Sequence, residues 1–191
     1  MKTITIIKTV LFALVMNFTL LAQAQLETIA TFPESRPGNI TVSNDGRIFV
    51  TMSALSASKY MVKEILPNGE AIPFGDKEWI VKPENGSLKG INSTIGIQAD
   101  ANGILWVLDM GNVQQNQVPK LVGFDLVTVN VTKVFPIPNT VLSTKPFLQD
   151  FVIDVKNNTA VIADMTDALN PPIAPAFVVI NLETGHIRRV L

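Results

Sequence analysis

The chain has 191 residues, of which 47% are hydrophobic, 16% are charged and none is cysteine. This length fits one domain of ordinary size, and the hydrophobic fraction is too high for a disordered chain. The absence of cysteine excludes a disulfide framework, a thiolate metal site and a cysteine nucleophile. With 15 basic and 16 acidic residues the formal charge is −1, so we expect no nucleic-acid partner, because that binding requires clustered cations.

Residues 1–24 have the pattern of a secretory signal peptide. A basic start with two lysines is followed by an apolar run over residues 10–21, and Ala22-Gln23-Ala24 offers the small residues that signal peptidase recognises. A transmembrane anchor is the alternative, but the run is shorter than the roughly 20 apolar residues that a bilayer requires and Asn17 interrupts it. We therefore predict cleavage before Gln25, a secreted protein that is extracellular or periplasmic, and no membrane contact after cleavage.

One hairpin pattern occurs three times in residues 25–191. Its copies are NITVSNDGRIFVT from Asn39, GIQADANGILWVLD from Gly96 and DFVIDVKNNTAVIAD from Asp150. Each copy consists of a short strand, a polar turn rich in Asn, Asp or Gly, and a second apolar strand, which is typical of a tight hairpin. The middles of the turns are 57 and 55 residues apart, which indicates an internal repeat.

A second hairpin follows each copy, and Leu66, Leu126 and Leu182 mark it with a period of 56 to 60 residues. The repeating unit is therefore two hairpins, or four strands, which is the β-propeller blade. The segment 104–108 is apolar on both faces, as expected for a sheet packed between two neighbours. We predict an all-β propeller of about three four-stranded blades, with a β-sandwich as the alternative. The predicted repeats are residues 32–90, 91–146 and 147–191.

The segments RPGNITVSNDGRIFV, GIQADANGILWVLDMG, PKLVGFDL, LQDFVIDVKNNTAVIAD and AFVVINLETGHIRRVL resemble the yellow/major royal jelly protein family, in its bacterial, dopachrome-tautomerase-related branch. The resemblance extends from about Phe32 to Leu191 and implies a secreted six-bladed propeller. Val118 stands where insect members tend to carry cysteine. Three repeats would be half of such a ring with two blade faces uncovered. We therefore expect either a fragment whose partner is the missing half of the propeller, or a second copy that closes the ring.

Carboxylates at equivalent strand ends are the first candidates for a ligand site. Asp109 and Asp164 end equivalent strands, and Asp150 begins the strand pair before Asp164. Carboxylates at such points of successive blades would converge at the channel mouth, where they would bind an amine or a Ca²⁺-like cation. The alternative is that each one accepts N–H groups of its own turn.

Three polar residues, Arg36, Asn39 and Asn92, precede the innermost strands of their repeats, and Trp79 lies in a polar loop where it would stack on an aromatic ligand. We predict that the protein binds a small aromatic or amine-bearing ligand at the channel mouth and needs no cofactor. The alternative is a gluconolactonase-like or dopachrome-tautomerase-like enzyme that uses the channel carboxylates with or without a divalent cation. Whether a reaction is catalysed stays open.

Overall fold

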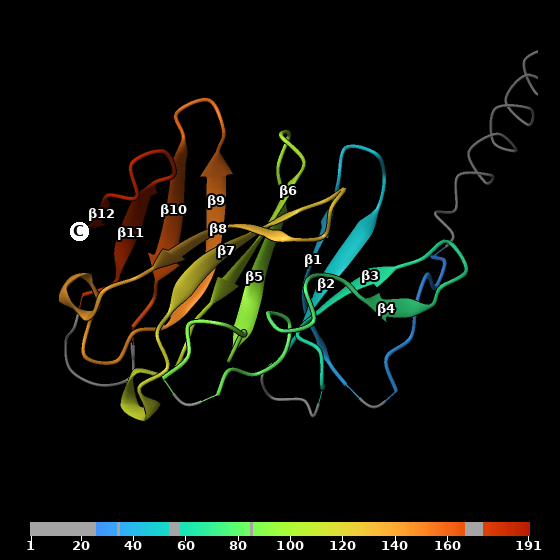
Figure 1. The fold of residues 1–191 in the computed structure, drawn as a ribbon, viewed down its shortest axis with the longest axis horizontal. Coiled ribbons are helices and arrows are strands. Elements are labelled where there is room, and N and C mark those ends of the chain that lie inside the picture. The colour runs from blue at the N-terminus through green and yellow to red at the C-terminus, as the bar shows by residue number, and fades with distance from the viewer. Residues whose placement is uncertain (1–25, 34, 54–57, 85, 167–173) are drawn as a thin grey trace, which may run out of the picture.

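The computed structural model of the chain describes residues 26–33, 35–53, 58–84, 86–166 and 174–191. The predicted signal peptide, residues 1–24, lies outside the described residues. The described part contains three four-stranded antiparallel sheets, each with its strands in chain order (Figure 1). No helix in this part is long and apolar enough to cross a membrane.

The strands and the two short 3₁₀ helices follow one another in a regular order. The first sheet contains β1 (Pro37–Val42), β2 (Ile48–Met52), β3 (Val62–Ile65) and β4 (Ala71–Pro73). The second contains β5 (Thr94–Ala99), β6 (Ile104–Asp109), β7 (Lys120–Asp125) and β8 (Val131–Pro136), with η1 (Val113–Gln115) between β6 and β7. The third contains β9 (Leu148–Asp154), β10 (Thr159–Asp164), β11 (Ala176–Asn181) and β12 (Ile187–Val190), and η2 (Asn139–Val141) precedes it.

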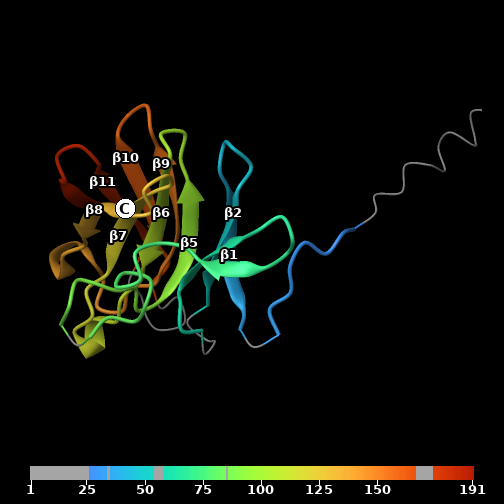
Figure 2. The ribbon, with the colours of Figure 1, turned by 45° about the vertical axis from the view of Figure 1, so that its right-hand side comes forward.

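The three sheets are three blades of a β-propeller. They stand side by side in the order of the chain, and the first strand of each sheet, β1, β5 or β9, lies innermost (Figures 1 and 2). The blades fall inside the three repeats that the sequence predicts, so the all-β propeller architecture is confirmed. We refer to them as blade 1, blade 2 and blade 3.

Polar side chains inside the hairpins fix the register of the strands. In blade 2 one carboxylate oxygen of Asp100 accepts the backbone N–H groups of Asn102 and Ile104, and the other accepts the indole N–H of Trp106 at 2.8 Å. The turn is therefore tied to a strand residue that is 2% exposed. This hydrogen bond allows Trp106, which the sequence already indicates as a core residue, to be buried without an unpaired donor.

Each blade has an N-side face toward the preceding blade and a C-side face toward the following one. The C-side face of blade 1 and the N-side face of blade 2 enclose a first core, which also takes in apolar residues of the connection from β4 to β5. The C-side face of blade 2 and the N-side face of blade 3 enclose a second core around Trp106. A β-sheet that is apolar on both faces, as the 104–108 segment predicts, is thus buried on both faces.

Hydrogen bonds join the inner strands of neighbouring blades. The hydroxyl of Thr51 on β2 donates to the Ile95 carbonyl on β5 at 2.7 Å, and the Thr41 hydroxyl on β1 accepts the Ala99 N–H on β5 at 3.0 Å. From blade 2 to blade 3 the Gln98 side chain accepts the Ile153 N–H at 2.9 Å. These bonds hold β1, β5 and β9 at fixed heights relative to one another.

The two ends of the blades differ in their connections. Tight turns join β1 to β2, β5 to β6 and β9 to β10 at one end, which we call the turn end. The longer connections lie, in their described parts, at the other end, which we call the loop end (Figure 1); these parts are residues 53, 58–61, 74–84, 86–93, 110–119, 137–147, 165–166 and 174–175. Long loops on one end of a repeat scaffold are the usual place for a binding site.

Candidate functional site

Asp109, at the end of β6, is a buried anchor for the loops around it. Its side chain is wholly buried, and its oxygens accept the backbone N–H groups of Asn92, Ser93 and Gly111 at 2.9–3.0 Å. The same carboxylate forms an ion pair of 2.6 Å with Lys120, which is 1% exposed. A carboxylate that is surrounded in this way holds the loop end of blade 2 together.

Blade 3 repeats this anchor with a different cation. Asp164 accepts the N–H groups of Phe147 and Thr166 and binds the Arg189 guanidinium at 2.6 Å. Blade 1 has Met52 at the equivalent strand end, also fully buried. The structure thus places Asp109 and Asp164 in the role of N–H acceptors that the sequence offers as their alternative.

The innermost strands carry a shared irregularity near the loop end. In each blade the innermost strand has one residue more than its partner strand at this point. The register shifts between Pro37 and Ile40 in β1 and between Thr94 and Ile97 in β5. In β9 it shifts opposite Ala163 and Asp164 of β10. These are β-bulges, which bend a strand and change the direction of a side chain, often beside active sites.

The third residue of each innermost strand lies at this bulge, and we call the set of Asn39, Gly96 and Asp150 the bulge row. Asn39 is half-buried and Asp150 is exposed, while Gly96 between them has no side chain. A Cβ atom added at Gly96 would lie 3.0 Å from the Phe151 ring and 3.4 Å from the Asp150 carboxylate. Gly96 is itself buried, and because it has no side chain the Phe151 ring of blade 3 can lie close to its backbone, so the centre of the bulge row is packed and its polar groups are Asn39 and Asp150.

The remaining predicted residues lie around the same end of the blades. Arg36 is exposed, and its carbonyl accepts the N–H of Ser53 at 2.8 Å. Asn92 is half-buried and donates its side-chain amide to the Gly111 carbonyl at 3.0 Å. Trp79 is half-buried and packs against the first core. The predicted residues thus lie at one end of the blades. Asp109 and Asp164 anchor the loops, Asn39 and Asp150 belong to the bulge row, and Arg36, Trp79 and Asn92 lie in the connections that precede the innermost strands.

The charges at this end do not form a ready metal site. Among the described residues, no three His, Cys, Asp or Glu side chains come close enough together to hold a metal ion. Asp150 accepts the N–H of Phe151 at 2.9 Å and keeps an exposed carboxylate. The arrangement can offer the exposed Asp150 carboxylate and the half-buried Asn39 amide to a ligand.

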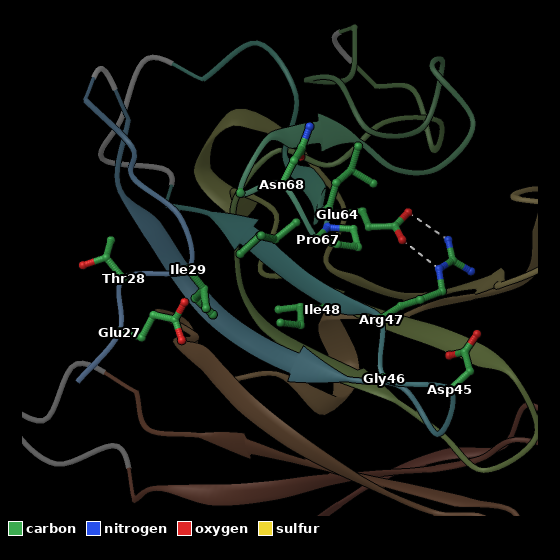
Figure 3. Close-up of a pocket in the computed structure, with 13 residues that line it drawn as sticks. Glu27, Thr28, Ile29, Asp45, Gly46, Arg47, Ile48, Glu64, Pro67 and Asn68 are labelled. Atoms are coloured by element: carbon green, nitrogen blue, oxygen red, sulfur yellow. Dashed lines mark hydrogen bonds and ion pairs between the residues drawn. The ribbon is translucent and has the colours of Figure 1, made fainter. Parts of the chain in front are cut away.

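A hollow lies at the other end of the molecule, at the turn end of blade 1. It has a volume of about 550 Å³ and is lined by the N-terminal segment 27–29 and by residues 64–69 of the second hairpin (Figure 3). Arg47 lines it too, but Glu64 engages the guanidinium at 2.7 and 2.8 Å and raises the pKa of Arg47. The same guanidinium lies over the Phe49 and Phe74 rings, so Arg47 has a structural role.

Reasoning from the sequence missed three residues at the loop end. Lys120 and Arg189, the partners of the buried carboxylates, lie on other strands, and no local spacing connects them to Asp109 or Asp164. Gly96 carried a usable signal, because a glycine inside a strand marks a bulge or a close approach by another group.

The sequence profile of the family described as major royal jelly protein matches residues 92–191, which include blades 2 and 3. The chain belongs to the major royal jelly protein family. The resemblance of the repeat segments to this family is thereby confirmed, and no curated protein matches the chain.

Solved structures show the fold of this family member at low sequence identity. The extracellular domain of a hybrid two-component system from B. thetaiotaomicron has a TM-score of 0.51 and 13% identity, over 86% of this chain and 18% of that one. The extracellular domain of a one-component system from the same organism has a TM-score of 0.50 and 11% identity, over 81% and 18%. A protein of unknown function from Bacteroides caccae has a TM-score of 0.45 and 12% identity, over 84% and 62%. The chain thus spans 18% of the length of each of the first two domains.

Proposed function

We propose that this protein is a secreted propeller that binds a small aromatic or amine-bearing ligand at the loop end, where the central channel opens. The observation that carries the proposal is the bulge row. Three innermost strands deviate from regular pairing at the same point, where Asn39 is half-buried, Gly96 is buried against Phe151 and Asp150 is exposed. Bulges of this kind are frequent beside active sites, which makes this row the candidate for ligand contact.

Asp150 supports the choice of an amine as the ligand group. An ammonium ion donates charge-assisted hydrogen bonds to a carboxylate, and such bonds are about twice as strong as neutral ones. Asn39 adds an amide whose NH₂ group can donate to a ligand, while its oxygen accepts the Ile40 N–H at 2.8 Å. Trp79 and Arg36, at the same end, are available to an aromatic ring as it enters.

The anchors explain why the site would be ready before the ligand arrives. Asp109 fixes the starts of the loops at Asn92 and Gly111, and Asp164 does the same for Phe147. Loops held by buried carboxylates lose little conformational freedom on binding, so less of the interaction energy is spent on ordering them. Export of the protein rests on the signal-peptide pattern of residues 1–24.

The test is the binding of tyramine, an aromatic amine, measured by isothermal titration calorimetry on the wild type and on Asp150→Asn. A hydrogen bond to a charged group contributes about 1.5–3 kcal/mol, so we expect the variant to bind at least about tenfold more weakly. Asp154→Asn is the matched control, because Asp154 is an exposed carboxylate on the same strand and the same face. It should leave the affinity within about twofold.

A second ligand separates the contribution of the ligand's amine from that of its aromatic ring. The compound 4-ethylphenol lacks the amine of tyramine, so its binding should be insensitive to Asp150→Asn. Equal loss of both ligands would mean that the variant disturbs the bulge row rather than the ion pair, and unchanged tyramine binding would reject the amine site. If EDTA abolished the binding, the alternative of an enzyme with a divalent cation would be favoured over the proposed ligand-binding protein.

A further inference from the structure

Two hairpin turns of the described structure contain an asparagine directly before a glycine. Asn68-Gly69 lies between β3 and β4 of blade 1, and Asn102-Gly103 lies between β5 and β6 of blade 2. In such a pair the glycine nitrogen can attack the side-chain carbonyl carbon of the asparagine, because no Cβ atom of the glycine obstructs the approach. Whether the attack occurs in the folded protein depends on how firmly each turn holds the two groups. Asn85, of the pair Asn85-Gly86, lies outside the described residues.

The two asparagine side chains are held to different degrees. Both are exposed, but Oδ1 of Asn68 accepts the Glu70 N–H at 3.0 Å. Asn102 donates its backbone N–H to the Asp100 carboxylate at 2.8 Å, and its side chain has no hydrogen-bond partner among the described residues. The amide of Asn68 is therefore fixed in one orientation, whereas that of Asn102 can rotate toward the glycine that follows it.

The two glycine nitrogens are held to different degrees as well. Gly69 donates its N–H to the Leu66 carbonyl at 2.8 Å, while the N–H of Gly103 reaches the Asp100 carbonyl at 3.4 Å. N–H···O bonds in proteins are most often about 2.9–3.0 Å long, so the bond of Gly103 is a weak one. Because the nitrogen must give up this proton in order to attack, Gly103 reacts from the less restrained state.

The space around the two glycines also differs. A Cβ atom added at Gly69 would lie 2.9 Å from the Ile29 carbonyl oxygen, while one added at Gly103 would meet nothing within 4 Å. Water can therefore reach the Asn102-Gly103 peptide. Blade 2 is packed between blades 1 and 3 through its two faces, and the tip of its first hairpin lies outside both cores. The exposure of Asn102 is thus a property of the hairpin itself.

We propose that Asn102 is a site of spontaneous deamidation in the folded protein, through a cyclic imide formed with Gly103. The Gly103 nitrogen forms a bond to Cγ of Asn102, the bond between Cγ and the side-chain nitrogen breaks, and that nitrogen leaves as ammonia with the proton of the Gly103 N–H. Water then cleaves one of the two bonds between the ring nitrogen and its carbonyl carbons. Cleavage at Cγ gives aspartate at position 102, and cleavage at the backbone carbonyl carbon gives isoaspartate. The proposal is independent of the ligand site.

The isoaspartyl product disturbs the anchor of this hairpin. It adds a methylene group to the backbone between positions 102 and 103 and a negative charge beside the Asp100 carboxylate. That carboxylate binds the N–H groups of Asn102 and Ile104 and the indole of Trp106. A longer backbone displaces Ile104 relative to position 102, so the carboxylate cannot bind both N–H groups in the present geometry. We therefore expect the modified protein to unfold at a lower urea concentration.

Peptide mapping by mass spectrometry tests the proposal on folded protein stored for several weeks in mildly alkaline buffer and digested in acid. The conversion of the amide to an acid should proceed at least about tenfold faster at Asn102 than at Asn68, because the second site must first break two ordinary hydrogen bonds. In concentrated urea the two sites should react at similar rates, since folding no longer holds either of them. Equal rates in the folded protein, or the same ratio with and without urea, would overturn the proposal.

Two alanine variants connect the modification to the hairpin. The urea midpoint of the wild type should fall during storage, while that of Asn102→Ala should stay constant. Asn68→Ala is the matched control, because it removes the asparagine of the other pair, and its midpoint should fall as in the wild type. If Asn102→Ala lost as much stability on storage as the wild type, deamidation at this turn would not be the cause and the proposed damage to the hairpin would be rejected.

Discussion

The buried ion pair between Asp109 and Lys120 can be tested by exchanging it for the solution that another blade uses. The two residues are paired on neighbouring strands of blade 2. In blade 1 the corresponding residues are Met52 and Met61, joined by a backbone hydrogen bond of 2.9 Å and both almost fully buried. We therefore compare Lys120→Met, Asp109→Met and the double variant.

The expected magnitudes follow from burial and from the hydrogen bonds. Removing one partner of a buried ion pair costs about 3–5 kcal/mol, because the other charge stays buried without compensation. Lys120→Met should lie near the lower end of this range, since Asp109 keeps three backbone N–H donors. Asp109→Met should cost at least as much, because it also removes the acceptor of those donors.

The double variant has no buried charge left. Its remaining cost is that of three N–H groups without their acceptor, at roughly 1 kcal/mol each. These groups belong to half-buried loop residues that water can reach, so we expect a total of about 2–3 kcal/mol. The sum of the single variants exceeds about 6 kcal/mol, and the cycle should therefore show a coupling energy of about 3 kcal/mol or more.

The assay is urea unfolding followed by circular dichroism and by tryptophan fluorescence, which must give coincident transitions for the cycle to be interpreted. Lys89→Met is the control, because Lys89 pairs with Glu78 on the surface, where both side chains are more than half exposed. Its effect should stay below about 1 kcal/mol. If the double variant lost as much stability as the two single variants together, the Asp–Lys pair would not be a coupled unit and the reasoning would be refuted.

Two further predictions concern the outer turns. Val129 has a left-handed backbone, with φ of 66°, at the turn position where blades 1 and 3 have Gly69 and Gly185. Val129→Gly should therefore be more stable than Val129→Ala in urea by about 1 kcal/mol, and the opposite order would exclude backbone strain as the cause. The N–H and hydroxyl of Thr128 lower the pKa of Asp125 below its usual value. The ionised carboxylate thus contributes stability that is complete above about pH 4 and is lost as the pH falls through the lower folded pKa. Asp125→Asn should flatten this acid dependence of the unfolding free energy, and an unchanged acid limb would assign it to other groups.

The architecture was predictable because its signals are local. Each hairpin of the repeat has its turn residues within a few positions of its strands, so Asp45, Asn102 and Asn157 revealed the period without any knowledge of distant contacts. The apolar run 104–108 likewise showed that both faces of blade 2 are covered. These features are dictated by backbone conformation and burial, which act within the segment that carries them.

The roles of the loop-end carboxylates were not predictable in the same way. Asp109 and Asp150 are both aspartates within strands, yet one is wholly buried and the other is exposed. Asp109 is paired with Lys120 of the next strand, whereas Asp150 follows the bulge of β9. Both features depend on strand register.

Register also separates the anchors from the bulge row. An aspartate at the last position of the second strand points into the loops of its own blade, where N–H groups of the chain entering the blade surround it. A residue at the bulge of the innermost strand lies beside the neighbouring innermost strands, as the approach of Gly96 to Phe151 and Asp150 shows. Carboxylates at the first position therefore stabilise blades individually. Residues at the second position lie between blades, where the presence or absence of a side chain decides how closely two innermost strands approach each other.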